Sequence, residues 1–138
     1  MVCDYVDNKK YLITEDIYSK IQWNTSQSTV GEYAGSNIKA ECDQFAIDTG
    51  IDQMDYVIDT GVGKVFIPIK EQMNGGFSWF NSNERRIANL YDRAAIYWTA
   101  DTYRTDTTYA WMVTTEGSFS IQPKYLSHGF RPCICIQY

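Results

Sequence analysis

The chain has 138 residues, of which 44% are hydrophobic and 21% are charged, and this balance is typical of one globular domain. Its 17 acidic and 12 basic residues leave a formal net charge of −5, which excludes the basic surface that nucleic acid and anionic membranes require. Aromatic residues make up 15% of the chain, with 11 tyrosines. We therefore expect a single domain over residues 1–138, no nucleic-acid or membrane partner, and some aromatic rings that face solvent or a ligand.

The first ten residues read as polar and acidic rather than as a secretory signal, and no stretch reaches the roughly 18 apolar residues that span a bilayer.

The four cysteines are Cys3, Cys42, Cys133 and Cys135. We expect them to be free, buried structural thiols, because disulfide frameworks belong to shorter secreted chains. Cys133 and Cys135 with one distant histidine, His128, make a weak zinc site, so we expect no metal and no cofactor.

The N-terminal half predicts one long helix among short strands. A strand is expected over 10–13, a helical turn over 14–21 and a polar connection over 24–35. Ser36 caps a helix to about residue 48, which Gly50 ends, with Ile38, Cys42 and Phe45 on one face. Short strands are expected over 57–58 and 64–69, the second at an edge or an end because it contains Pro68.

The C-terminal half predicts a second helix followed only by strands. Ser82 caps the helix, and the residues at helical spacing are Ile87, Leu90, Tyr91 and Ala94. Strands follow over 95–99, 108–114, 118–122 and 132–138, with a hairpin turn at Glu116 and Gly117. Helices that lead and strands that finish are typical of an α+β domain.

Several short motifs resemble, in order and spacing, an uncharacterised domain family of bacterial surface proteins and phage proteins. In the C-terminal half they are 64–69, 83–86, Tyr97-Trp98-Thr99, 109–113 with Gly117, and Gly129-Phe130-Arg131-Pro132. The looser N-terminal matches are 10–15, Trp23 with Ser26 or Ser28, and 38–47. Members of that family look like C-type lectin-fold domains, a fold shared with formylglycine-generating enzymes and with the variable proteins of diversity-generating retroelements. The chain departs from the family at 98–101, where Trp-Thr-Ala-Asp replaces Trp-Leu-Arg-Ser, so no role of that arginine is carried over.

The resemblance implies a C-type lectin-like fold: two helices packed on a small, mainly antiparallel sheet, with a C-terminal hairpin and a final strand. Within it we expect Gly117 to form a turn, Gly129 to adopt a positive φ, and Pro132 to start the last strand. We expect Arg131 to clamp a carboxylate or several carbonyls. Trp98 and Trp111 are expected to fill the core.

The segment 101–108 contains no aliphatic residue and joins two strands, so it predicts a surface loop. Loops on a rigid scaffold are common recognition sites, and planar side chains bind at low entropic cost. The candidate ligand-binding residues are Asp101, Tyr103, Arg104, Asp106 and Tyr109, with Tyr125 and His128 as a second patch. A solvated connection between two strands is an equally good interpretation of this loop.

The calcium-binding motifs of true C-type lectins, Glu-Pro-Asn and Trp-Asn-Asp, do not occur in the chain, and two loop aspartates are too few for a calcium site.

Our hypothesis is a non-catalytic recognition module, part of the receptor-binding or decoration apparatus of a phage virion. The expected partner is a host-surface glycan or protein, with other virion proteins or further copies of the chain as additional partners. A location on the bacterial cell surface, within a larger protein, is the alternative. Two alternative functions stay open: a structural subunit of a virion or surface fibre, and a divergent cysteine enzyme using Cys133 and Cys135.

Overall fold

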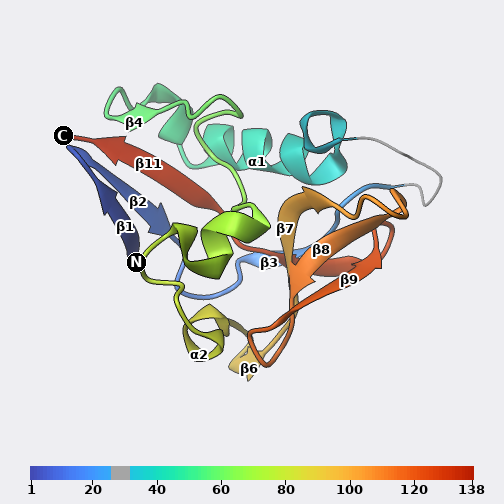
Figure 1. Cartoon of the computed structure of the whole chain (residues 1–138). Helices are drawn as coiled ribbons and strands as arrows, with labels where there is room; N and C mark the ends of the chain where they lie inside the picture. The colour runs from blue at the N-terminus through green and yellow to red at the C-terminus, as the bar shows by residue number, and fades with distance from the viewer. Residues whose placement is uncertain (26–31) are drawn as a thin grey trace.

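The computed structural model describes residues 1–25 and 32–138 (Figure 1). It is a mixed α+β structure in which strands dominate and nearly all pairings are antiparallel, as the sequence predicts. The proposed matches at Ser26 and Ser28 lie outside the described residues.

One sheet brings the two ends of the chain together. Its strands follow the order β1 (Val2–Val6), β2 (Lys9–Ile13), β11 (Cys133–Gln137) and β4 (Val57–Ile58), all antiparallel. In Figure 1, β11 lies directly beside β2. The alternation expected for the last strand is present, because Cys133 and Cys135 are buried whereas Ile134 and Ile136 are half-buried.

The second sheet carries the loop that the sequence singles out. Its strands follow the order β3 (Ser19–Gln22), β10 (Ser127–Phe130), β7 (Tyr97–Thr102), β8 (Tyr109–Val113) and β9 (Phe119–Pro123). β10 pairs with β7 in parallel at Gly129 and Tyr97, and the other pairs are antiparallel. The expected hairpin of β8 and β9 is therefore present.

Helical segments are few and mostly short. The longest is α1 (Asn37–Asp48), and the Ser36 hydroxyl caps it by accepting a hydrogen bond from the Lys39 amide at 3.1 Å. Gly50 follows at φ +75°, a left-handed conformation that suits glycine, so both predicted ends of α1 are confirmed. The other segments are η1 (Tyr33–Gly35), η2 (Ile51–Gln53), the kinked η3 (Gln72–Gly76) and α2 (Asn83–Arg86).

The five-stranded sheet has core on both faces. Tyr97 and Val113 pack into one apolar cluster with residues of the four-stranded sheet, whereas Trp98 and Met112 pack into the other beneath α1. Burial on both sides fixes β7 and β8 rigidly. The connection between these two strands therefore starts and ends on a firm scaffold.

The predicted second helix is wrong beyond its first turn. Ser82 caps α2, but the helix ends at Arg86, and a two-stranded hairpin follows, β5 (Asn89–Leu90) with β6 (Arg93–Ala94). The burial alternates, since Arg86, Ala88 and Leu90 are buried and the residues between them are exposed. That period of two is typical of extended backbone and outweighs the helical spacing of the apolar residues.

Two smaller predictions are also wrong. The segment 14–21 is not helical but bends at residues 15–16 and enters β3. The segment 64–69 forms a single bridge, in which Phe66 and Cys133 exchange backbone hydrogen bonds of 3.0 and 2.8 Å. Pro68, which has no amide hydrogen, prevents the bridge from extending into a longer ladder.

Gly129 serves close packing rather than a turn. It does not have a positive φ, and a β-carbon placed there would lie 2.7 Å from the Ile96 carbonyl oxygen and 2.8 Å from Tyr97 Cβ. The glycine therefore lets β10 approach β7. Gly117 does have a positive φ, at +80°, and it lies in the expected turn between β8 and β9.

Arg131 is the clamp that the sequence predicts. Its guanidinium donates to the carbonyl oxygens of Thr14 and Glu15, at 2.9 and 3.1 Å, and to the hydroxyl of Tyr97 at 3.1 Å. Pro132 directly precedes β11 and accepts a hydrogen bond from the Thr14 amide.

All four cysteines are free and buried, as expected. Within the described residues, no helix has the length and apolar character needed to cross a bilayer.

Candidate functional site

The connection between β7 and β8 is a surface loop, as predicted, and its backbone is tied at both ends. The Tyr103 amide donates to the Tyr109 carbonyl oxygen at 2.9 Å, and the Tyr109 amide donates to that of Asp106 at 3.0 Å. The amide of Lys124, at the end of β9, donates to the Thr108 carbonyl oxygen at 2.9 Å. Arg104, Thr105 and Asp106 form the exposed tip of a loop whose base is fixed.

A first hollow of about 240 Å³ opens beside Trp111. The ammonium nitrogen of Lys70 lies 3.8 Å from the centre of the Trp111 ring, and the Tyr103 ring meets that ring edge-on at 5.5 Å. Trp111 is half-buried, so the prediction that it fills the core is wrong, whereas Trp98 is 1% exposed and confirms its prediction. Trp111 instead forms a wall of the hollow, together with Asp101 and Arg104.

A second hollow, of about 410 Å³, shares three residues with the first. Asp101, Thr102 and Arg104 line both, and Glu32, Ala100 and Thr107 complete the second. One Asp101 carboxylate oxygen accepts a hydrogen bond from the Lys70 amide, which fixes the carboxylate between the two hollows. Arg104 is exposed and forms no hydrogen bond or ion pair with any described residue. Its guanidinium can therefore bind an acceptor from outside the molecule.

The Asp106 side chain forms hydrogen bonds within the loop. Its carboxylate accepts hydrogen bonds from the Thr108 amide at 3.1 Å and from the Thr108 hydroxyl at 2.6 Å. These bonds lower the pKa of Asp106 below its usual value. Tyr109 begins β8 and is half-buried. Of the five predicted loop residues, Asp101, Tyr103 and Arg104 line the hollows, while Asp106 and Tyr109 shape the loop.

Tyr125 and His128 lie apart from the hollows. Tyr125 is 38% exposed in the turn between β9 and β10, and its carbonyl accepts a hydrogen bond from the Gln22 side chain at 2.7 Å. The His128 ring meets the ring of Trp98 edge-on at 5.1 Å. Burial, followed by the nearby positive charge of Lys20, lowers the pKa of His128. Neither residue of the second predicted patch lines the hollows beside the loop.

Two lysines that are not among the predicted binding residues support the loop. Lys70 lies over the Trp111 ring. Lys124 is buried, with its ammonium donating to the Thr102 hydroxyl at 3.0 Å and lying 4.2 Å from the centre of the Trp23 ring. Burial lowers the pKa of Lys124. Nothing local in the sequence distinguishes these lysines from solvated ones, because their partners are distant along the chain.

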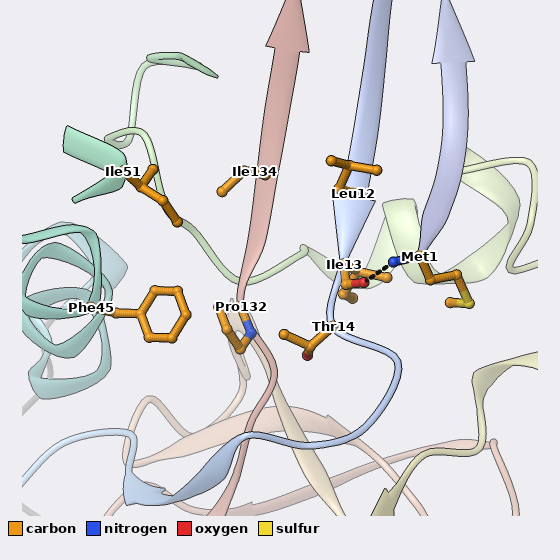
Figure 2. Close-up of a pocket in the computed structure, with 8 residues that line it drawn as sticks. All are labelled: Met1, Leu12, Ile13, Thr14, Phe45, Ile51, Pro132 and Ile134. Carbon is orange, nitrogen blue, oxygen red and sulfur yellow. Dashed lines mark hydrogen bonds between the residues drawn. The ribbon is translucent and has the colours of Figure 1, made fainter. Parts of the chain in front are cut away.

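A separate hollow, of about 260 Å³, lies between the four-stranded sheet and α1, and Figure 2 shows its lining. Leu12 of β2 and Ile134 of β11 lie on adjacent strands, and the Phe45 ring of α1 lies beside Pro132, with Thr14 on the other side of the proline. Thr14 supplies the one side-chain hydroxyl of this lining. This lining has fewer polar side chains to orient a ligand than the loop hollows have, so it is a weaker candidate than the loop.

The cysteines lack the features of a nucleophilic pair. Cys133 and Cys135 are 1% and 0% exposed, and burial raises the pKa of both thiols. Among the described residues, no three side chains of histidine, cysteine, aspartate or glutamate form a group that could hold a metal ion.

Comparison with known proteins adds no assignment to this geometry: no family model, curated protein or solved structure matches the chain.

Proposed function

We propose that the chain is a non-catalytic recognition module that binds a host-surface glycan through the two hollows beside the β7–β8 loop. The observation that carries this proposal is the exposed Arg104, unpartnered among the described residues, next to the fixed carboxylate of Asp101 and the ring of Tyr103. Sugars present hydroxyl groups that both donate and accept hydrogen bonds, and a guanidinium beside a carboxylate offers both kinds of partner.

The lining also favours a polar ligand over an apolar one. Both hollows are walled mainly by charged, hydroxyl-bearing and aromatic side chains, with Ala100 as the one aliphatic residue. The ammonium of Lys70 covers Trp111, so stacking of a sugar ring is expected on Tyr103 rather than on the indole. A protein ligand with polar side chains is the second candidate for the same surface.

We further propose that this α+β structure is C-type lectin-like and that the module belongs to a phage virion, or to a larger protein of the bacterial surface. The antiparallel sheets, the capped helix and the C-terminal hairpin with its final strand support the first part. The family resemblance supports the second. Contacts with other virion proteins or with further copies of the chain belong to the same proposal.

The experiment is binding of the labelled protein to bacterial cells and to arrayed bacterial surface glycans. Arg104→Ala and Tyr103→Ala are expected to lower binding at least tenfold. Arg93→Ala and Tyr5→Ala, which remove exposed residues outside the loop, serve as matched controls and are expected to retain it. Equal binding by all four variants would show that the loop is not the recognition surface.

A further inference from the structure

A third cavity, of about 310 Å³, adjoins the loop hollows through Ala100, which lines both it and the larger hollow. Phe66 and Ile67 are 3% and 2% exposed and form its buried floor. Val62 and Ile69, which are 40% and 37% exposed, form part of its rim. Its volume is at the lower end of the roughly 300–1,000 Å³ range of ligand pockets.

The cavity lies next to the loop because two hydrogen bonds join the segment 68–70 to β7. The Ala100 amide donates to the Pro68 carbonyl oxygen at 3.1 Å, and the Lys70 amide donates to the Asp101 carboxylate. On the other side, the Asp59 carboxylate accepts hydrogen bonds from the amides of Gly61 and Gly63 at 2.8 and 3.0 Å. These bonds hold the turn that contributes Thr60 and Val62 to the wall.

The Gln72 side chain, in the wall of the cavity, offers an unused hydrogen-bond donor. The Gln72 side-chain oxygen accepts a hydrogen bond from the Ile69 amide at 2.9 Å, which fixes the side-chain amide in place. Its nitrogen forms no hydrogen bond with any described residue, although Gln72 is half-buried. The cavity thus combines an apolar floor with a donor at its wall. The apolar floor and the Gln72 donor together suit a small group that carries both a methyl and a carbonyl oxygen.

We propose that this cavity is a subsite for the acetamido group of an N-acetylated sugar whose ring occupies the adjoining loop hollow. The inference rests on the proposed glycan binding and names the class of glycan. The acetamido methyl lies on the apolar floor, and its carbonyl oxygen accepts from Gln72. A sugar with a hydroxyl at that position gains less there, because it has no methyl group to bury against the apolar floor.

The test compares two uncharged trisaccharides of the same linkage, the β1→4 trimer of N-acetylglucosamine and that of glucose, by calorimetric titration. We expect the N-acetylated trimer to bind at least tenfold more tightly. Gln72→Glu keeps the acceptor for the Ile69 amide but removes the donor, and it is expected to weaken binding of the N-acetylated trimer threefold to tenfold without affecting the glucose trimer. Gln137→Glu adds the same charge on β11, outside the cavity, and is the matched control.

The outcomes separate the two proposals. Equal binding of both trimers that Arg104→Ala abolishes would overturn the acetamido subsite and leave glycan binding intact. Absence of binding to both trimers and to host glycans alike would overturn the proposed function and the subsite with it. Ile69→Ser supplies a second variant that alters the exposed rim; a loss of the preference for the N-acetylated trimer supports the subsite, and an unchanged preference contradicts it.

Discussion

Two buried arginines hold the core through backbone carbonyls rather than through acidic side chains. Arg131 binds the segment before β3, while Arg86 donates to the carbonyl oxygens of Gly117, Met73 and Phe80. The hydroxyl of Tyr97 joins them, since it accepts from Arg131 and donates to the Arg86 carbonyl oxygen. Burial raises the pKa of Tyr97 to about 12, which keeps this hydroxyl a donor at neutral pH.

We predict that Arg131→Met destabilises the fold by about 3 kcal/mol, because it leaves two carbonyl oxygens and one hydroxyl without their donor. Urea unfolding followed by tryptophan fluorescence measures this change. The control Arg93→Met removes an exposed arginine and should alter the free energy of unfolding by less than about 0.5 kcal/mol. A similar small effect at Arg131 would show that the clamp does not stabilise the fold.

We predict that His128 makes the stability of the fold depend on pH. Its pKa is lower in the folded protein than in the unfolded chain, so unfolding takes up protons between the two values. The contribution of His128 to the free energy of unfolding is therefore fully present above the unfolded pKa of about 6.5. This contribution is lost as the pH falls through the folded pKa. His128→Gln should flatten stability against pH in that window. Because the chain has one histidine, an NMR titration of its ring reads the folded pKa directly.

At the level of the elements, the turn between β8 and β9 packs against α2 so closely that only glycine fits. A β-carbon at Gly117 would lie 1.8 Å from the Asn83 carbonyl oxygen, at a φ of +80°. Gly50 has a similar φ of +75°, but nothing lies within 4 Å of its β-carbon position. The two glycines thus separate the cost of packing from the cost of backbone conformation.

We predict that Gly117→Ala destabilises the protein by more than about 3 kcal/mol, whereas Gly50→Ala costs only the roughly 1–2 kcal/mol of a left-handed residue. Thermal and urea unfolding of the two variants measures the difference. Equal effects would mean that the contact between the turn and α2 relaxes without cost.

Elements with local signals could be predicted from the sequence, and elements set by distant partners could not. The cap at Ser36 and the glycine at 50 lie within a few residues of the helix they bound, so α1 was predictable. The hairpin of β5 and β6 depends on burial of Arg86 and Leu90 against residues far along the chain. The loop was predictable from its polarity, but its supports, Lys70 and Lys124, were not, because Trp111 and Trp23 lie far from them in sequence.

For the whole molecule, the fold buries all four thiols, so chemical access to them requires opening of the structure. We predict that a thiol reagent labels none of the four cysteines in the native protein and all of them in denaturant, with a native labelling rate that follows the rate of global opening. Fast labelling of Cys133 or Cys135 alone would contradict this burial and would favour a reactive cysteine pair.

The proposed glycan site is the loop between β7 and β8, which the strands of the five-stranded sheet hold at both ends. The most direct measurement is a backbone amide NMR map of the labelled protein during titration with a host-surface glycan fraction. We predict that chemical-shift changes cluster at Lys70 and residues 100–109, with the resonances of the remainder of the sheets unchanged. Shifts centred on the apolar hollow at Phe45 and Ile134, or on the exposed Trp79, with the loop unaffected, would contradict it.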